Sequence, residues 1–368
     1  MTSSDLGLPV VRSGMELVPA LEEGAPAQTG KDFTSDQEVR WCPGCGDYAV
    51  LKAVQGFLPD LGLRRENIVF VSGIGCSSRF PYYLATYGMH SIHGRAPSIA
   101  TGIATCREDL SVWVVTGDGD ALSIGGNHLI HALRRNVNMT ILLFNNRIYG
   151  LTKGQYSPTS ETGKVTKSTP MGSVDHPFNP VSLALGAGAT FAARTIDRDR
   201  HHMTDVLRAA AEHEGSAFVE IYQNCPVFND GAFAALTDKD KAVFNRIPLV
   251  HGEPIRFGTD GSRGLIHDST SGGVKVVEIG DAPDQVSHDD VLIHDAYNPD
   301  ATTAFAISRL TDAGRLHQAP IGIFRQVARQ TYDDQARDQI VHATAGVEGS
   351  PSERLSTLIG GGDTWTVA

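Results

Sequence analysis

Short apolar segments alternate with segments of helical periodicity through the first two thirds of the chain. Four apolar segments are predicted to be buried strands, at 68–71, 112–115, 140–144 and 217–222. Residues with helical spacing lie between and beside them, at 99–110, 129–133 and 202–214. Strands that alternate with helices form a parallel sheet that helices cover on both faces. The alternation therefore predicts an α/β fold built on such a sheet.

Glycines and polar residues follow the ends of these four strands. They are Gly75 with Cys76, residues 117–120, residues 145–148, and Cys225. Parallel sheets place their binding sites at the carboxyl ends of the strands. We therefore expect these four strand ends to form one site.

Residues 117–120 read Gly-Asp-Gly-Asp between a strand and a helix. Glycine lets the backbone approach an anion, and the start of a helix supplies free N–H groups. A carboxylate beside a phosphate is repulsive unless a cation lies between them, and Mg²⁺ prefers such oxygens. Asn146 ends the next strand, so Asp118 and Asn146 can reach the same ion. The pattern predicts a Mg²⁺–diphosphate site, and the alternative is a Gly-Asp turn that caps a helix without a ligand.

A dinucleotide-binding fingerprint is excluded at this position. That fingerprint needs a third glycine, and the chain has Leu122 there.

The chain has five cysteines, Cys42, Cys45, Cys76, Cys106 and Cys225. Structural disulfides are rare in a reducing cytosol, and the odd number leaves one cysteine over in a four-ligand site. The Cys-Pro-Gly-Cys turn and the two cysteines at strand ends could hold zinc or a [4Fe–4S] cluster. The single C-x-x-C favours the cluster, although Cys76 and Cys225 could also be ordinary buried cysteines. The fifth, Cys106, is expected in the core because it shares an apolar helix face with Ile99 and Ile103.

Composition excludes some classes of function. The chain has 31 Lys and Arg against 42 Asp and Glu, a formal net charge of −11, which argues against a nucleic-acid-binding protein. No apolar run approaches the length of a membrane span, and the N-terminus does not resemble a secretory signal. We expect a cytoplasmic protein.

The chain divides into three predicted regions. Residues 1–30, rich in Pro, Gly, Ser and Glu, are expected to form a mobile arm. Residues 31–250 form the α/β domain, in which Asp47 is a plausible N-cap of the first helix. Residues 251–368 form a glycine-rich C-terminal extension of unknown role, with helices expected near 301–312 and 333–345.

Five motifs occur together in one order. They are Trp-Cys-Pro-Gly-Cys-Gly (41–46), Gly-Ile-Gly-Cys-Ser-Ser (73–78), His-Gly-Arg (93–95), Gly-Asp-Gly-Asp (117–120) and Asn-Asn-x-x-Tyr-Gly-Leu-Thr-Lys-Gly-Gln (145–155). In this order the chain resembles the beta subunit of 2-oxoacid:ferredoxin oxidoreductases, most closely the 2-oxoglutarate type. The resemblance covers about residues 36–230.

The resemblance implies a thiamine-diphosphate-binding fold and specific roles for the motif residues. One [4Fe–4S] cluster would be held by Cys42, Cys45, Cys76 and Cys225. Mg²⁺ would be held by Asp118, Asn146 and the carbonyl of Ile148. Thiamine diphosphate would contact Ile74, Gly75, Cys76, Ser77, His93, Gly119, Asp120, Gly150 and Leu151. Without the motif context, His93 would be interpreted as a surface loop histidine.

The resemblance also implies the reaction. It is the oxidative decarboxylation of 2-oxoglutarate with coenzyme A to succinyl-CoA and CO₂, with ferredoxin as electron acceptor. The carboxylate that activates the cofactor would come from an alpha subunit, so no catalytic residue is assigned in this chain. The chain would be active only in a complex with that subunit, which we expect to be α2β2.

Substrate choice has its own candidate and its own alternatives. Arg79 is either a surface charge or the partner of the distal carboxylate of a dicarboxylic substrate, through a bidentate contact. The nearest alternative function is the same reaction on pyruvate or on a broad range of 2-oxoacids. Two others are a non-redox thiamine decarboxylase or carboligase with structural zinc, and a non-catalytic zinc-stabilised binding module.

Overall fold

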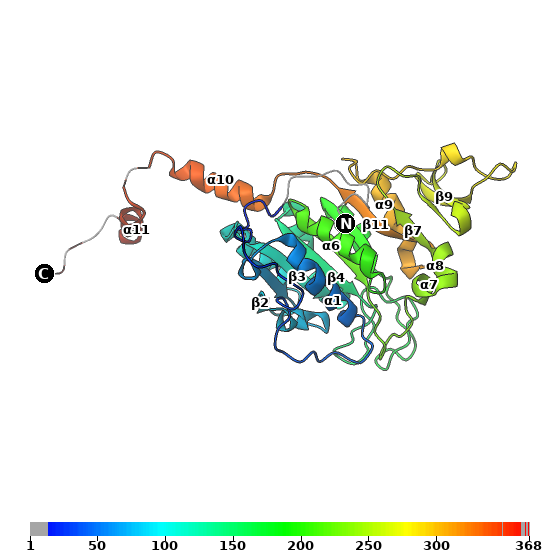
Figure 1. The fold of residues 1–368 in the computed structure, drawn as a ribbon, viewed down its shortest axis with the longest axis horizontal. Helices are drawn as coiled ribbons and strands as arrows, with labels where there is room; N and C mark the ends of the chain where they lie inside the picture. The colour runs from blue at the N-terminus through cyan, green and yellow to red at the C-terminus, as the bar shows by residue number, and fades with distance from the viewer. Residues whose placement is uncertain (1–13, 348, 362–364, 366, 368) are drawn as a thin grey trace.

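An eight-stranded sheet forms the centre of the computed structural model, which describes residues 14–347, 349–361, 365 and 367. Its strands are β1 (Ile68–Ser72), β2 (Tyr87–His90), β3 (Ser111–Gly117), β4 (Met139–Asn145), β5 (Phe191–Ile196), β6 (Ser216–Tyr222), β7 (Arg246–Leu249) and β11 (Ala319–Gln326). They lie in the order β2-β1-β3-β4-β6-β5-β11-β7 (Figure 1). The four strands predicted from the sequence are β1, β3, β4 and β6.

The pairing is parallel across most of the sheet. Strands β2, β1, β3, β4, β6 and β5 are parallel to one another. Strand β11 is antiparallel to β5 and parallel to β7. Every residue of β1, β4, β5 and β6 is buried, because helices cover both faces of a parallel sheet. The predicted α/β architecture is confirmed.

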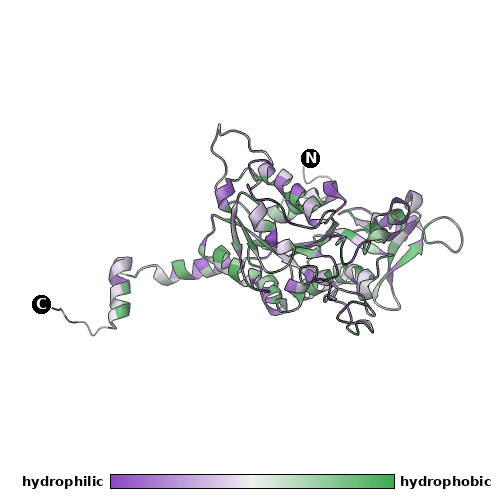
Figure 2. Cartoon of the chain, turned by 90° about the horizontal axis from the view of Figure 1, so that it is seen from below, coloured by the Kyte–Doolittle hydropathy of each residue, from purple (hydrophilic) through white to green (hydrophobic). Residues whose placement is uncertain are grey.

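Helices cover the two faces of the sheet in two groups. The helices of the chain are α1 (Asp47–Phe57), α2 (Ala96–Cys106), α3 (Asp118–Leu122), α4 (Gly126–Arg135), α5 (Pro180–Gly186), α6 (Arg200–Glu212), α7 (Ala234–Thr237), α8 (Lys239–Asn245), α9 (Thr302–Ser308), α10 (Tyr332–Thr344) and α11 (Pro351–Gly360). Residues of α1 and α6 pack on one face, where Phe70 stacks on Trp113 with ring centroids 5.5 Å apart. Residues of α2, α4 and α5 pack on the other, against Val69 and Val71. Figure 2 shows hydrophobic residues concentrated in the sheet between these layers.

The region after residue 250 is tied into the main sheet. Strand β11 pairs between β5 and β7, so a boundary at 250 does not separate a domain from an extension. A second, three-stranded antiparallel sheet contains β8 (Arg256–Phe257), β9 (Arg263–Asp268) and β10 (Gly273–Glu278). The helices predicted near 301–312 and 333–345 are present as α9, which continues into a 3-10 helix (Arg309–Gly314), and as α10.

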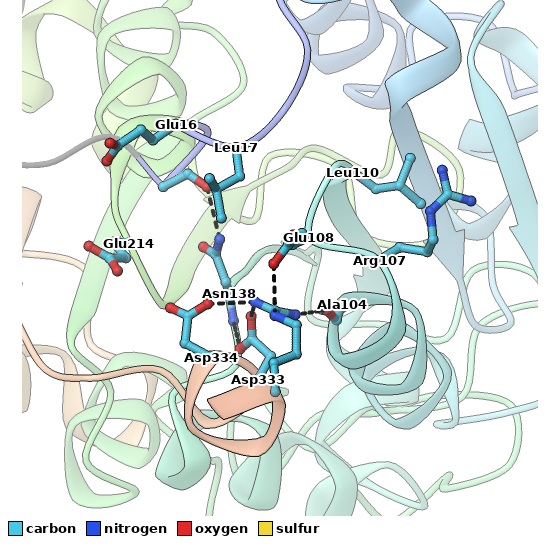
Figure 3. A pocket seen from close by; sticks show the side chains of 12 residues that line it. Glu16, Leu17, Ala104, Arg107, Glu108, Leu110, Asn138, Glu214, Asp333 and Asp334 are labelled. Atoms are coloured by element: carbon cyan, nitrogen blue, oxygen red, sulfur yellow. Dashed lines mark hydrogen bonds and ion pairs between the residues drawn. The ribbon is translucent and has the colours of Figure 1, made fainter. Parts of the chain in front are cut away.

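Helices α10 and α11 extend away from the body of the molecule (Figure 1). The start of α10 is fixed to α2 by Arg337, whose Nη1 donates to the Ala104 carbonyl over 2.9 Å. The Nε atom of Arg337 lies 3.2 Å from Glu108 Oε2, and its Nη2 lies 3.3 Å from Asp333 Oδ2. The Asp334 carboxylate also pairs with Arg337 Nη2, and Figure 3 shows the three carboxylates of this contact, Glu108, Asp333 and Asp334.

Part of the N-terminal region is attached to the domain. Residues 1–13 lie outside the described part of the chain, but residues 14–20 pack on the domain. Val18 is buried in the core, and Asn138 Nδ2 donates to the Gly14 carbonyl over 2.8 Å. Ala20 forms an isolated bridge with Leu63. Residues 14–20 are therefore attached to the domain, while the mobility of the arm over residues 1–30 stays a prediction.

Two further details correct the sequence interpretation. Gly46 is the N-cap of α1, and Asp47 is its first helical residue with a buried side chain. Cys106 is exposed at the end of α2, although Ile99 and Ile103 pack partly against the core, so it is not a core residue. Among the described residues, no helix is long and apolar enough to cross a lipid bilayer.

Candidate functional site

A cavity lies at the carboxyl ends of β1, β3 and β4. Its lining includes all the residues predicted to contact the diphosphate cofactor or Mg²⁺: Ile74, Gly75, Cys76, Ser77, His93, Asp118, Gly119, Asp120, Asn146, Ile148, Gly150 and Leu151. They come from four loops that are far apart in the sequence. The parallel sheet brings these loops to one edge, as the strand-end pattern predicts.

Asp118 lies at the start of α3 with its carboxylate buried. Ser157 Oγ and Thr159 Oγ1 both donate to its Oδ2 atom, each over 2.5 Å. Burial raises the pKa of this carboxyl to about 6, while the two hydroxyl donors act in the opposite direction. A bound cation would favour the ionised form. The sequence does not single out Ser157 and Thr159, because hydroxyl residues in a loop rich in Ser and Thr carry no spacing pattern.

The turn after β4 presents Asn146 and Ile148 to the same cavity. Arg147 has a positive φ of 58°, which reverses the chain direction here. The Arg147 N–H donates to Asn145 Oδ1 and the Ile148 N–H donates to Asn146 Oδ1, each over 3.2 Å. Asn146 Nδ2 donates to Gln223 Oε1 over 2.9 Å. An amide oxygen has a second lone pair, so Asn146 Oδ1 keeps one for a metal.

The Asp120 carboxylate holds two cavity loops in place. Its Oδ1 accepts from the N–H groups of Ile74 and Gly94, over 3.1 and 2.8 Å, and lies 2.6 Å from His93 Nδ1. Its Oδ2 accepts from Thr116 Oγ1 over 2.7 Å. With these donors around it, the carboxylate orients the loops and the His93 ring. Asp120 lines the cavity, and its carboxylate holds Ile74, His93 and Gly94 in place there.

Two partly buried contacts hold the cysteine loops together. Trp41 Nε1 donates to the Cys76 carbonyl over 2.7 Å, which ties the C-x-x-C segment to the loop after β1. Gln223 Nε2 donates to Cys45 Sγ over 3.2 Å, which ties it to the end of β6. Burial raises the pKa of the Cys45 thiol above its usual range and that of Cys76 to about 12, and the Asp47 carboxylate adds to both shifts.

Gly150 lies between the cavity and the cysteines. A Cβ atom on Gly150 would lie 3.4 Å from Cys76 Sγ and 3.7 Å from Cys225 Sγ, so both sulfurs approach the same point of the backbone. Gly150 also lines the cavity, as does Cys76. The cysteine group and the cavity therefore share a wall.

Ionisation of the Cys45 and Cys76 thiols needs positive charge nearby, since burial favours their neutral form. An iron–sulfur cluster or a zinc ion would supply that charge. Zinc holds its sulfur ligands at about 2.3 Å. Among the described residues, no three His, Cys, Asp or Glu side chains lie close enough together to hold a single metal ion. Four cysteine thiolates can hold either a zinc ion or a [4Fe–4S] cluster.

Arg79 does not line the cavity, and neither do three of the four predicted cluster ligands, Cys42, Cys45 and Cys225. The Nη1 atom of Arg79 donates to the Arg40 carbonyl over 3.3 Å, on the side of the cysteine loops. Its positive charge acts on Cys76, where it opposes the rise in the thiol pKa.

Comparison with known proteins adds to this geometry. Residues 73–221 match the sequence family described as the thiamine pyrophosphate enzyme, C-terminal TPP binding domain. The 2-oxoglutarate oxidoreductase subunit KorB of Mycobacterium tuberculosis is 62% identical over 367 residues, which covers 100% of this chain and 95% of that protein. The 2-oxoacid:ferredoxin oxidoreductase subunit beta of Saccharolobus solfataricus is 44% identical over 192 residues, or 52% of this chain and 63% of that protein.

A solved structure has the same fold over nearly the whole chain. It is 2-oxoglutarate:ferredoxin oxidoreductase from Magnetococcus marinus, with 2-oxoglutarate, coenzyme A and succinyl-CoA bound. The TM-score is 0.71 at 33% identity, and the match covers 93% of this chain and 99% of that one.

Proposed function

This chain belongs to the family of 2-oxoglutarate oxidoreductase KorB subunits, and we propose that it binds thiamine diphosphate in an enzyme that oxidises 2-oxoglutarate. The reaction consumes coenzyme A, releases CO₂ and succinyl-CoA, and reduces ferredoxin. The observation that carries the proposal is the wall shared by the cavity and the cysteine group at Cys76 and Gly150. A redox centre there would lie directly beside the cofactor.

The residues of the cavity fit a diphosphate held through Mg²⁺. Asp118, Asn146 and the Ile148 carbonyl offer carboxylate, amide and peptide oxygens, the hard ligands that Mg²⁺ prefers. Residues 74–77, His93, Gly119, Asp120, Gly150 and Leu151 would surround the cofactor. When bound, thiamine diphosphate supplies the chemistry that breaks the bond between the oxo carbon and the carboxylate. The chain itself orients the cofactor and excludes water from its diphosphate end.

The cysteine group fits a [4Fe–4S] cluster. Cys42, Cys45, Cys76 and Cys225 would be its ligands. The fifth cysteine, Cys106, lies on α2 and lines neither the cavity nor this group. When bound, such a cluster accepts electrons one at a time, which suits a ferredoxin as the final acceptor.

The mouth of the cavity fits a protein partner. Ile74 and Leu151 line the cavity and still expose 38% and 46% of their surface. Exposed apolar side chains at the rim of a site are typical of a surface that another protein covers. We propose that an alpha subunit covers this rim in an α2β2 complex and supplies the carboxylate that activates the cofactor. The complex would act in the cytoplasm.

Arg79 has two possible roles, in binding the substrate or in the surroundings of Cys76, and one substitution distinguishes them. If its guanidinium turns from the Arg40 carbonyl to bind the distal carboxylate of the substrate, Arg79→Ala should lower kcat/KM for 2-oxoglutarate more than for pyruvate. Equal losses on both substrates would assign Arg79 to the surroundings of Cys76 instead.

The test of the proposed function uses the complex co-expressed with its alpha subunit. Purified without oxygen, it should reduce ferredoxin when given 2-oxoglutarate and coenzyme A, and should do so more slowly with pyruvate. Faster turnover of pyruvate would favour the broad-range alternative. Decarboxylation without ferredoxin reduction would favour the non-redox thiamine enzyme.

A further inference from the structure

Thr159 joins two parts of the metal site that come from different strands. Its side chain is 2% exposed, and its Oγ1 atom lies 2.5 Å from Asp118 Oδ2 and 2.9 Å from Asn145 Oδ1. Asp118 follows β3, and Asn145 ends β4 directly before Asn146. One hydroxyl group therefore contacts both of the segments that carry the proposed Mg²⁺ ligands.

The contact to Asn145 continues into the interior of the sheet. Asn145 Nδ2 donates to Glu220 Oε1 over 2.7 Å, and Arg194 Nε donates to Glu220 Oε2 over 2.6 Å. Both charged side chains are fully buried, on the neighbouring strands β6 and β5. The row of side chains runs from Arg194 through Glu220 and Asn145 to Thr159.

A buried ion pair is a costly way to stabilise a sheet. Removing two charges from water costs several kcal/mol for each ion, and an apolar pair of similar volume is often as stable. What a buried ion pair contributes instead is a set of hydrogen bonds with fixed directions. Here the Glu220 carboxylate fixes Asn145 Nδ2, so Asn145 Oδ1 is directed at the Arg147 N–H and holds the turn that presents Asn146 and Ile148.

The single hydrogen of the Thr159 hydroxyl can go to only one acceptor at a time. Mg²⁺ requires Asp118 to be ionised, and an ionised carboxylate is the stronger acceptor. The hydroxyl then donates to Asp118 Oδ2 and sets the rotation of the carboxylate. Ser157 Oγ donates to the same oxygen, so the orientation is fixed from two sides.

We propose that Thr159 is a positioning residue of the Mg²⁺–diphosphate site, with the Arg194–Glu220 pair holding the Asn145 side of the same site. This inference rests on the proposed function, because it assumes that Asp118 and Asn146 bind Mg²⁺. Thr159 does not line the cavity. It acts by fixing the direction of the Asp118 carboxylate.

The test measures metal binding by the complex with its alpha subunit, freed of cofactor. Mn²⁺ replaces Mg²⁺ as the probe, and electron paramagnetic resonance follows its binding in the presence of thiamine diphosphate. Thr159→Val keeps the shape and removes the hydroxyl. A hydrogen bond to a charged group contributes about 1.5–3 kcal/mol, so the affinity for Mn²⁺ should fall roughly tenfold to a hundredfold. Thr159→Ser restores the hydroxyl and should recover most of it.

Thr190→Val is the matched control. Thr190 Oγ1 is also buried and donates to the side-chain oxygen of Asn136 over 2.5 Å, but it lies at the other end of the strands. This control should lose thermal stability without losing affinity for Mn²⁺. The double variant Arg194→Met, Glu220→Leu removes the pair without leaving an unpaired charge, and it should also bind Mn²⁺ more weakly.

The possible results distinguish a failure of the positioning role from a failure of the proposed function. Wild-type affinity in Thr159→Val, or equal losses in Thr159→Val and Thr190→Val, would overturn the role of Thr159. Wild-type affinity in the double variant would overturn the role of the buried pair. If the wild-type complex binds no Mn²⁺ with thiamine diphosphate, the proposed function itself fails.

Discussion

Gln223 Nε2 donates to the sulfur of Cys45 over 3.2 Å. The other end of the same amide, Oε1, accepts from Asn146 Nδ2 over 2.9 Å. One buried side chain at the end of β6 therefore touches a proposed cluster ligand and a proposed Mg²⁺ ligand. The two halves of the site are joined through the hydrogen bonds of the Gln223 amide as well as by a shared wall.

This contact predicts an effect on the redox potential. Hydrogen bonds to the sulfurs of an iron–sulfur cluster stabilise its reduced form, which carries more negative charge. Gln223→Leu should shift the midpoint potential of the cluster to more negative values, measured by a redox titration followed with electron paramagnetic resonance. Gln55→Leu removes a buried amide that donates to the Tyr83 carbonyl and should leave the potential unchanged. An unshifted potential in Gln223→Leu would show that the contact has no electronic effect.

A second prediction concerns acid stability. Burial lowers the pKa of His213 to about 3, and its ring packs on Phe191 while Nε2 lies 2.8 Å from Thr190 Oγ1. The unfolded chain takes up this proton below about pH 6.5, the ordinary pKa of histidine, whereas the folded chain does not until about pH 3. The stability that the neutral His213 contributes is thus present above pH 6.5 and is lost as the pH falls toward 3.

His213→Gln removes this titration and can keep the bond to Thr190. Between about pH 4 and 6, the free energy of unfolding of the wild type should fall more steeply with decreasing pH than that of His213→Gln. The largest difference is about 1.4 kcal/mol per pH unit, the value for one proton. Denaturant titrations across this pH range measure both slopes, and equal slopes would mean that His213 does not enter the folding equilibrium.

The attachment of α10 gives a third prediction. Arg337 donates to the Ala104 carbonyl near the end of α2 and contacts the carboxylates of Glu108, Asp333 and Asp334. Because its side chain is partly exposed, we expect Arg337→Met to cost only about 1–2 kcal/mol, mainly in the docking of α10. Hydrogen exchange in 332–344 should become faster, while affinity for thiamine diphosphate is unchanged. Protection of α10 equal to that of the wild type would contradict this role.

The sequence predicts most of the cavity because its residues lie next to strand ends. Cys76, Asp118 and Asn146 each follow an apolar run, and parallel strands bring such ends to one edge whatever the rest of the fold does. The position of β11 could not be predicted in this way. Its residues, 319–326, reach the sheet from a distant part of the chain, and only tertiary pairing places them between β5 and β7.

The residues that support the site were harder to predict than those that line it. Ser157 and Thr159 are short hydroxyl residues in a loop, and Gln223 is a single amide, so neither spacing nor composition marks them. Cys106 shows the limit of helical periodicity. The pattern gives the face on which the cysteine lies, but it does not tell whether other elements cover that face.

Iron content tests the central claim most directly. The complex with its alpha subunit, purified without oxygen, should be brown and hold about four iron and four sulfide per copy of this chain. Cys225→Ser should lower both, while Cys106→Ser should leave them unchanged. A colourless complex that holds one zinc per chain and no iron would contradict the account. So would an iron content that Cys225→Ser leaves unchanged.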